Sequence, residues 1–302
     1  MASTASVGSV IGKTVGSQIA ISGGAFGAAW RRLKRNKPAT VSAVIVILLI
    51  LVAIFAPVLA PYGYDQSNIQ DAGQFPNAKH LLGTDLLGRD LLSRLIYATR
   101  ASLLVAFAVQ LAALLVGVPF GFLAGLKRGV VENVLNAIVM VFNALPGFLF
   151  ALFLVTALGS GIPQLIFALM VTTWIGYARI MRAEVLRLRN RDFVLAAQAL
   201  GAGSWHIALR HLLPNSLTAL IIAVALGIPG TIYAEAGLSF LGLGIRDPIP
   251  SWGKMISDGI PTLRLFWHLI LFPLLALSTT TLSFMFLADA LRDALDPSRG
   301  KR

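Results

Sequence analysis

Long stretches of apolar residues recur along this 302-residue chain and constrain its fold more than any other feature. A membrane-spanning helix needs about 20 predominantly apolar residues. Hydrophobic residues make up 57% of the chain and charged residues only 13%, against about 25% charged residues in an ordinary soluble domain. This composition excludes a soluble globular enzyme and leaves no room for a large domain outside the membrane. We expect six spans, at residues 39–60, 101–126, 131–158, 162–181, 216–241 and 266–288.

The placement of the basic residues predicts how these spans are oriented. Six spans put both ends of the chain on one side, and eighteen of the 25 Lys and Arg residues then fall on that side. Because basic residues concentrate in cytoplasmic loops, we predict an all-α integral membrane protein with six transmembrane helices, N-in and C-in. The net charge of +12 then indicates contact with membrane lipid and not with nucleic acid, because the basic residues are dispersed over short segments.

These spans divide the chain into five parts. Pro61 stands where a signal peptidase would have to cut, so the first span is expected to stay attached. The parts are a cytoplasmic basic segment (1–38), the first transmembrane helix (39–60), an external loop with an interfacial helix (61–100), a five-helix core (101–290) that contains a cytoplasmic loop at 182–215, and a cytoplasmic tail (291–302).

The cytoplasmic loop at residues 182–215 has the pattern of two short helices joined at a glycine. Residues 192–200 favour a helix, which Gly201 can end in a left-handed conformation. A second helical run begins at Ser204, an expected N-cap, and reaches Pro214, where the next span should begin. We expect a projection that suits docking into a groove on a partner, because its small side chains allow close approach.

A second motif lies between the first two spans, at Leu82 to Arg94. Asp85 and Arg89 are four residues apart, as are Asp90 and Arg94. In both pairs the acidic residue comes first, which is the favourable order on a helix. Leucines at helical spacing supply an apolar face. We therefore predict a helix that lies along the membrane surface before the second span.

Three motifs together resemble one family of transporters. The cytoplasmic loop matches the coupling loop of the permease subunits of ATP-binding-cassette (ABC) importers at Ala196, Ala197, Gly201, Leu213 and Pro214. The external motif just described resembles the second permease subunit of dipeptide, oligopeptide and nickel importers in the same superfamily. A third motif of that subunit is similar to Ala234 to Gly244 followed by Pro250 to Gly253.

The resemblance implies an ABC importer permease fold in a bacterial or archaeal cytoplasmic (inner) membrane, half of a translocation pathway and a set of partners. These are a homologous second permease subunit, two ATP-binding-cassette ATPase subunits and an extracytoplasmic substrate-binding protein. ATP and magnesium would bind to the ATPase subunits, and this chain would bind no cofactor. Leu195 stands where the family usually has a glutamate, which puts a salt bridge from that position in doubt. The residues implied to couple this chain to the ATPases are Ala196, Ala197, Ala199, Leu200, Gly201, Ala202, His211 and Pro214.

Polar and small residues inside the predicted spans suggest further contacts. Glu235 is the one carboxylate that we place inside a span, and such residues are candidates for function. It either binds a neighbouring helix or lines the pathway, together with Ser239, Ser278 and Thr279. Glycines at every fourth position predict close helix packing, and prolines predict kinks or breaks. They are Gly117, Gly121 and Gly125, and Pro119, Pro146, Pro229 and Pro273.

The sequence offers no pattern for catalysis or metal binding. There is no cysteine, and the four histidines have no ligand spacing. A phosphate-loop-like run at residues 8–14 is one residue too short between its glycines. A secondary transporter would call for charged or discontinuous spans and an internal inverted repeat, and the sequence shows no such repeat. A membrane enzyme would need a catalytic cluster.

The substrate class remains open between peptides and nickel. A bare metal ion would be helped across by imidazole, thiolate or carboxylate ligands, which the predicted spans scarcely supply. We therefore favour short peptides, with nickel or a metal chelate as the alternative.

Overall fold

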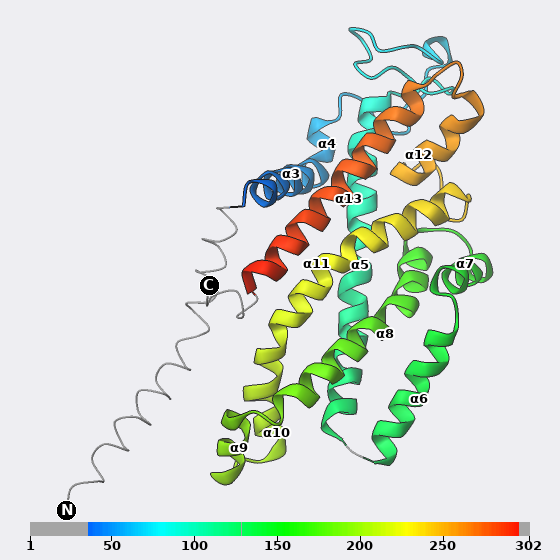
Figure 1. Cartoon of the computed structure of the whole chain (residues 1–302). Coiled ribbons are helices and arrows are strands. Elements are labelled where there is room, and N and C mark those ends of the chain that lie inside the picture. The colour runs from blue at the N-terminus through cyan, green and yellow to red at the C-terminus, as the bar shows by residue number, and fades with distance from the viewer. Residues whose placement is uncertain (1–35, 128, 296–302) are drawn as a thin grey trace, which may run out of the picture.

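The computed structural model describes residues 36–127 and 129–295, and helices form the framework of this part of the chain (Figure 1). Five helical runs in it are long and apolar enough to cross a membrane. They are α3 (Lys37–Ile54), α5 (Leu91–Leu126), α8 (Ile162–Leu188), a continuous run Ser204–Phe240 that ends in α11 (Leu213–Phe240), and α13 (His268–Leu295). Shorter helices are α4 (Ala56–Leu59), α9 (Asp192–Ala199), α10 (Ser204–Ile207) and α12 (Trp252–Gly259).

The third predicted span is not a single straight helix. α6 (Val130–Ala144) and α7 (Gly147–Leu158) meet at an angle of 79°. Leu145 adopts an extended conformation with φ −84° and ψ 132°, because the proline that follows it disfavours helical geometry. Pro146 thus breaks the span, whereas Pro119, Pro229 and Pro273 lie inside continuous helices. Counted as one span, α6 and α7 bring the total to six, which confirms the all-helical class.

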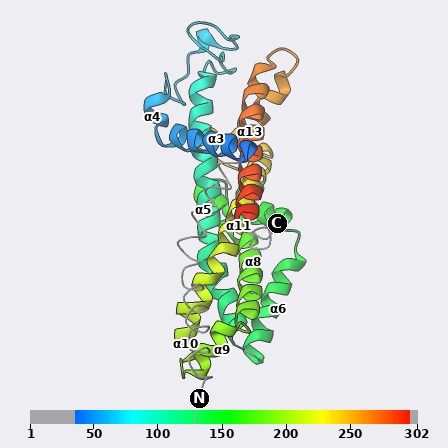
Figure 2. The same cartoon turned by 60° about the vertical axis from the view of Figure 1, so that its left-hand side comes forward.

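The first helix stands apart from the others in direction and in burial. Figure 2 shows α3 lying across α5 and α13. Only Ala39, Ser42 and Val46 of this helix are buried. A helix that is apolar on all sides belongs in the membrane, so most of the α3 surface is available to lipid or to another protein.

The closest helix contact in the bundle joins α5 to α8. A side chain on Gly117 or Gly121 would overlap the backbone of Trp174 or Ala178 on α8. A Cβ atom on Gly125 would come within 2.7 Å of the Val185 side chain. The glycine stripe therefore lets two backbones touch, as its spacing predicted.

The external segment before α5 differs from the predicted interfacial helix. Residues 82–90 form turns, and Gly88 has a φ of +71°, which a side chain would tolerate poorly. Asp85 accepts hydrogen bonds from the backbone N–H groups of Leu87 and Arg89, both at 2.9 Å. Such local bonds from aspartate compete with helix formation. The helix begins only at Leu91.

Ion pairs and caps hold this external segment in place. Asp90 caps α5 by accepting a hydrogen bond from the Ser93 N–H at 2.8 Å. The predicted Asp85 and Arg89 pair forms at 2.6 Å, but within a turn. Lys79 donates to Asp71 at 2.7 Å, which lowers the pKa of the Asp71 carboxyl and raises the pKa of the Lys79 ammonium.

The α5 to α8 contact predicts opposite effects for two alanine substitutions. Gly121→Ala places a methyl group on the Ala178 backbone and should destabilise the protein by about 1–3 kcal/mol, as overpacking does. Gly176→Ala in α8 meets nothing within 4 Å and should gain up to about 1 kcal/mol of helix propensity. Thermal unfolding of both variants in detergent measures the difference, and equal midpoints would contradict the packing described here.

Candidate functional site

In the projection at residues 192–205, a glycine cap at Gly201 ends α9. Gly201 has a φ of +80°, and its N–H donates to the Gln198 carbonyl at 2.9 Å. The Ala202 N–H donates to the Ala197 carbonyl at 3.0 Å. These two bonds make a Schellman motif. They fix the turn between α9 and α10 as the sequence predicted.

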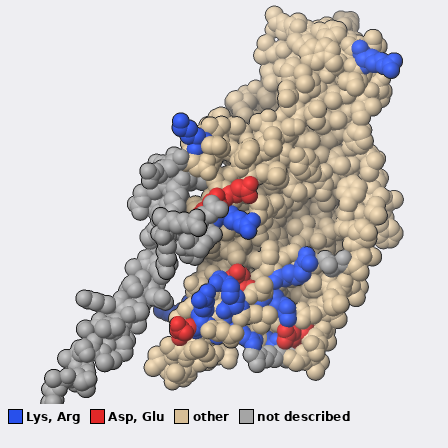
Figure 3. Space-filling view, in the orientation of Figure 1, with Lys and Arg blue, Asp and Glu red and all other residues tan. Residues whose placement is uncertain are grey.

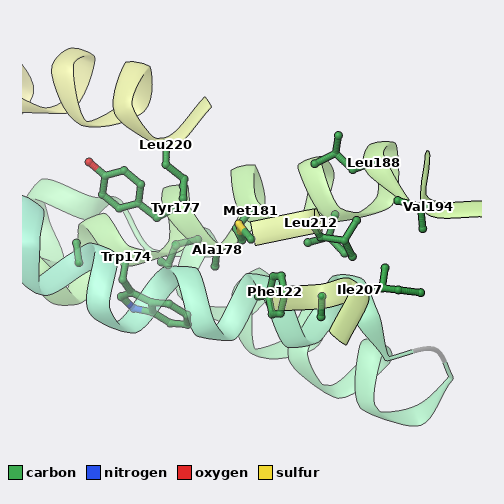
Figure 4. Close-up of a cluster of buried hydrophobic side chains, with 14 residues drawn as sticks. Phe122, Trp174, Tyr177, Ala178, Met181, Leu188, Val194, Ile207, Leu212 and Leu220 are labelled. Carbon is green, nitrogen blue, oxygen red and sulfur yellow. The ribbon is translucent and has the colours of Figure 1, made fainter. Parts of the chain in front are cut away.

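The inner face of this projection belongs to the core of the bundle. Val194 of α9 and Ile207 of α10 are buried in a cluster that includes Leu188 of α8 and Leu212. Figure 4 shows these side chains in one continuous group with Met181 and Phe122 further along the helices. The projection is therefore attached to the transmembrane helices by apolar packing.

The outer face presents apolar side chains to the surroundings. Leu200 is 88% exposed and Trp205 is 61% exposed. Leu195, where the family's glutamate is absent, is 50% exposed. Exposed apolar groups of this size on a projecting turn are typical of a surface that another protein covers.

The structure brings the predicted coupling residues together in this projection, with two exceptions in detail. His211 lies inward and packs against Phe193, with ring centroids 6.2 Å apart. Pro214 lies beyond the turn, on the first turn of α11. Exposed residues in the set are Ala196, Ala199, Leu200, Gly201 and Pro214, whereas Ala197, Ala202 and His211 are half-buried.

The second predicted short helix is instead the start of a long one. Gly203, and not Ser204, is the N-cap of α10, and no side chain caps it. The helix continues through a π-helical turn at Ala208–Leu212 into α11, for 37 residues in all. A π turn just before Pro214 is a known way to accommodate the hydrogen bond that proline cannot make. The helix is therefore continuous from Ser204 in the projection to the end of α11.

Charged side chains gather at the same end of the molecule (Figure 3). Arg182 of α8 pairs with Glu132 of α6 at 2.5 Å, and Arg187 pairs with Glu184 at 2.6 Å. Basic residues outnumber acidic residues in residues 179–215, which is the charge balance that cytoplasmic loops usually have.

Glu235 is buried inside the chain. Its carboxylate accepts hydrogen bonds from the Ser102 hydroxyl of α5 at 3.0 Å and from the Ser239 hydroxyl at 2.7 Å. It is 0% exposed, so in this conformation it makes a helix contact and faces no open passage. Ser278 is half-buried and Thr279 is exposed on α13, and no hydrogen bond of the described residues joins either of them to Glu235.

A second buried polar group was not singled out from the sequence. Gln110 of α5 donates to the Thr231 hydroxyl of α11 at 2.5 Å. It also accepts a hydrogen bond from the Tyr177 hydroxyl of α8. The three side chains, which we call the Gln110 network, join the three central helices. The isolated glutamine in an apolar span was the available signal, because unpaired polar groups are costly in a membrane.

The described residues offer no metal site. No cluster of three or more His, Asp or Glu side chains able to hold a metal ion occurs within residues 36–127 and 129–295. The candidate site is the projection at residues 192–205, which presents apolar side chains outward and packs into the core on its inner face.

Comparison with known proteins places this architecture in a family. The family described as "Binding-protein-dependent transport system inner membrane component" matches residues 117–301. The N-terminal TM domain of oligopeptide transport permease C matches residues 25–79.

Individual relatives match almost the whole chain. The dipeptide transport system permease protein DppC of Bacillus subtilis is 41% identical over 270 residues, covering 89% of this chain and 84% of that protein. The oligopeptide transport system permease protein OppC of the same organism is 38% identical, covering 89% and 88%. The glutathione transport system permease protein GsiD of Pectobacterium atrosepticum is 36% identical, covering 89% of each.

A solved structure shows the same fold. An inward-facing MetNI methionine ABC transporter contains a chain that aligns with a TM-score of 0.53 and 18% identity, covering 68% of this chain and 98% of that one. The family consists of transport permeases and not of enzymes. This chain therefore belongs to the binding-protein-dependent transport system inner membrane components, as a multi-pass permease of the inner membrane.

Proposed function

We propose that the chain forms half of the translocation pathway of an ATP-driven importer for short peptides. The observation that carries this proposal is the projection at residues 192–205, which is apolar on its outer face and anchored in the core on its inner face. A permease driven by separate ATPases needs such a part, because the force must enter through a surface contact and reach the spans. Dipeptide, oligopeptide and glutathione permeases among the relatives support the peptide class.

The proposed assembly contains a homologous second permease, two ATPase subunits and a substrate-binding protein. The chain ends and the projection face the cytoplasm, where the ATPase subunits bind ATP and magnesium and this chain binds neither. Residues 61–90 and α12 face the binding protein on the outer side. The charge asymmetry of the loops supports this orientation.

The mechanism we propose is alternating access. Closure of the ATPase subunits displaces α9, and the buried contacts of Val194 and Ile207 carry the displacement to the long helices. Nucleotide binding then shifts the population between inward-facing and outward-facing forms, by as much as its affinity for the two forms differs. The Gln110 network and Glu235 hold the moving helices at fixed spacing.

Competition for uptake tests the substrate class. Cells that carry this permease with its partner subunits should take up a labelled dipeptide, and an excess of unlabelled di- to oligopeptides should suppress that uptake. Nickel and its chelates should have no effect. Competition by nickel or its chelate but not by peptides would overturn the peptide assignment and leave the fold unaffected.

Two valine substitutions test the role of the turn. Gly201→Val forces a β-branched residue into a positive φ and should cost about 1–2 kcal/mol locally, whereas Gly203 has a φ of −66° that valine adopts readily. Neither glycine has a neighbour within 4 Å of its Cβ position, so the pair differs chiefly in backbone conformation. We expect Gly201→Val to insert normally and to lose most ATP-dependent uptake and binding-protein-stimulated ATPase activity.

The Gly203→Val variant is the matched control and should retain both activities. Uptake at the unsubstituted level in membranes that contain Gly201→Val would mean that this turn does not transmit force.

A further inference from the structure

A pocket of about 580 Å³ opens at the end of the molecule away from α9. It lies between the turns that precede α5, α12 with the loop that leads into it, and the first turn of α13. Its volume falls in the range of small-ligand sites. Three cations and three carboxylates line it, namely Arg89, Arg94 and Lys254, and Asp85, Asp247 and Asp258.

One wall of the pocket has more positive than negative charge. Arg89 and Arg94 share the single carboxylate of Asp85, whose Oδ2 lies 2.6 Å from the Arg89 Nε and 3.6 Å from the Arg94 Nε. The longer separation is outside hydrogen-bond range. Arg89 therefore makes the stronger interaction with the Asp85 carboxylate.

Arg94 is the residue on that wall that is best placed to bind an anionic group. Its side chain is only 2% exposed, and one of its N–H groups donates to the Tyr64 carbonyl at 3.1 Å. A guanidinium carries several more donors, and none of the Arg94 nitrogens is both fully buried and without a partner, so its remaining donors are open to the pocket. A carboxylate, which accepts two parallel bonds from arginine, would satisfy the donors that the described residues leave over.

The opposite wall has the reverse imbalance. Lys254 lies 3.2 Å from a carboxylate oxygen of Asp247 and 3.2 Å from one of Asp258. These two acids therefore share one ammonium group, and both are substantially exposed, at 61% and 43% of their side chains. Arg94 also attracts both carboxylates, and an ammonium group placed between them would add a cation in direct contact.

We propose that this pocket binds a short zwitterionic peptide, with its terminal carboxylate on Arg94 and its terminal ammonium between Asp247 and Asp258. The proposal rests on the peptide-import function and adds a substrate site on the permease, at the outer end of the spans. A peptide delivered there would be held by its two termini, which every linear peptide carries, and not by its side chains.

Binding of three small probes to the assembled importer without its binding protein tests the site. The probes are dialanine, dialanine C-terminal amide and N-acetyl-dialanine, each added to nanodiscs that contain both permeases and the ATPases. We expect the amide and the acetylated peptide each to bind about tenfold more weakly than dialanine or worse, because each loses a hydrogen bond between charged groups. Equal binding of the three, or no binding of dialanine at millimolar concentration, would overturn the proposal.

Two substitutions assign the termini to the two walls. Arg94→Gln should abolish the preference for dialanine over its amide, and Asp258→Asn should reduce the preference over N-acetyl-dialanine. Asp258 is half-exposed, so its variant tests the site even if the buried arginine is needed for folding. Asp65→Asn changes an exposed acid outside the pocket and should preserve both preferences. Preferences unchanged in the Asp258 variant would contradict the proposed site.

Uptake by the complete importer separates this proposal from the assigned function. Normal peptide uptake combined with equal binding of the three probes would reject the pocket and leave the peptide importer intact. Uptake of nickel without uptake of peptides would reject the function itself.

Discussion

The close contact between α5 and α8 is the interaction on which the rest of the structure depends. In a membrane, helices gain little from burying apolar surface against each other, so association relies on close packing and interhelical hydrogen bonds. Gly121 provides the close packing, because without a side chain it lets the two backbones touch. Gln110 provides the interhelical hydrogen bonds, to side chains of α8 and α11. The three helices are thereby held as one unit in the middle of the bundle.

This unit reaches the docking projection without a flexible link. Three residues separate Leu188 at the end of α8 from Asp192 at the start of α9, and α11 is continuous with α10 through the π turn. Val194 packs in the same buried cluster as Leu188 of α8 and Leu220 of α11. A displacement of α9 by an ATPase subunit would therefore move both long helices together. At the other end of the molecule, α5 begins beside the charged pocket, so the same unit extends from the projection to the proposed peptide site.

The sequence allowed the prediction of features that depend on local chemistry. Gly201 ends α9 because a left-handed cap suits glycine, and Gly121 packs closely because it lacks a side chain. Predictions failed where a side chain binds nearby backbone groups and so competes with helix formation. Asp85 has the correct spacing to Arg89 for a helix, yet its carboxylate binds nearby backbone N–H groups and the segment forms a turn. Partners distant in sequence, such as Gln110 and Thr231, could not be paired from one sequence.

The distance between α9 and α5 in the working importer tests the central claim that they move as one body. Asp192→Cys and Leu115→Cys are both at exposed positions, and the chain has no other cysteine, so a pair of spin labels can be placed with cysteine-free partner subunits. Pulsed electron paramagnetic resonance would compare nucleotide-free and ATP-bound importer. A rigid unit predicts distances that agree within about 2 Å, the scale of small helix shifts. A change of about 5 Å, the length of one helical turn, would show that the projection moves independently of α5 and would contradict the account.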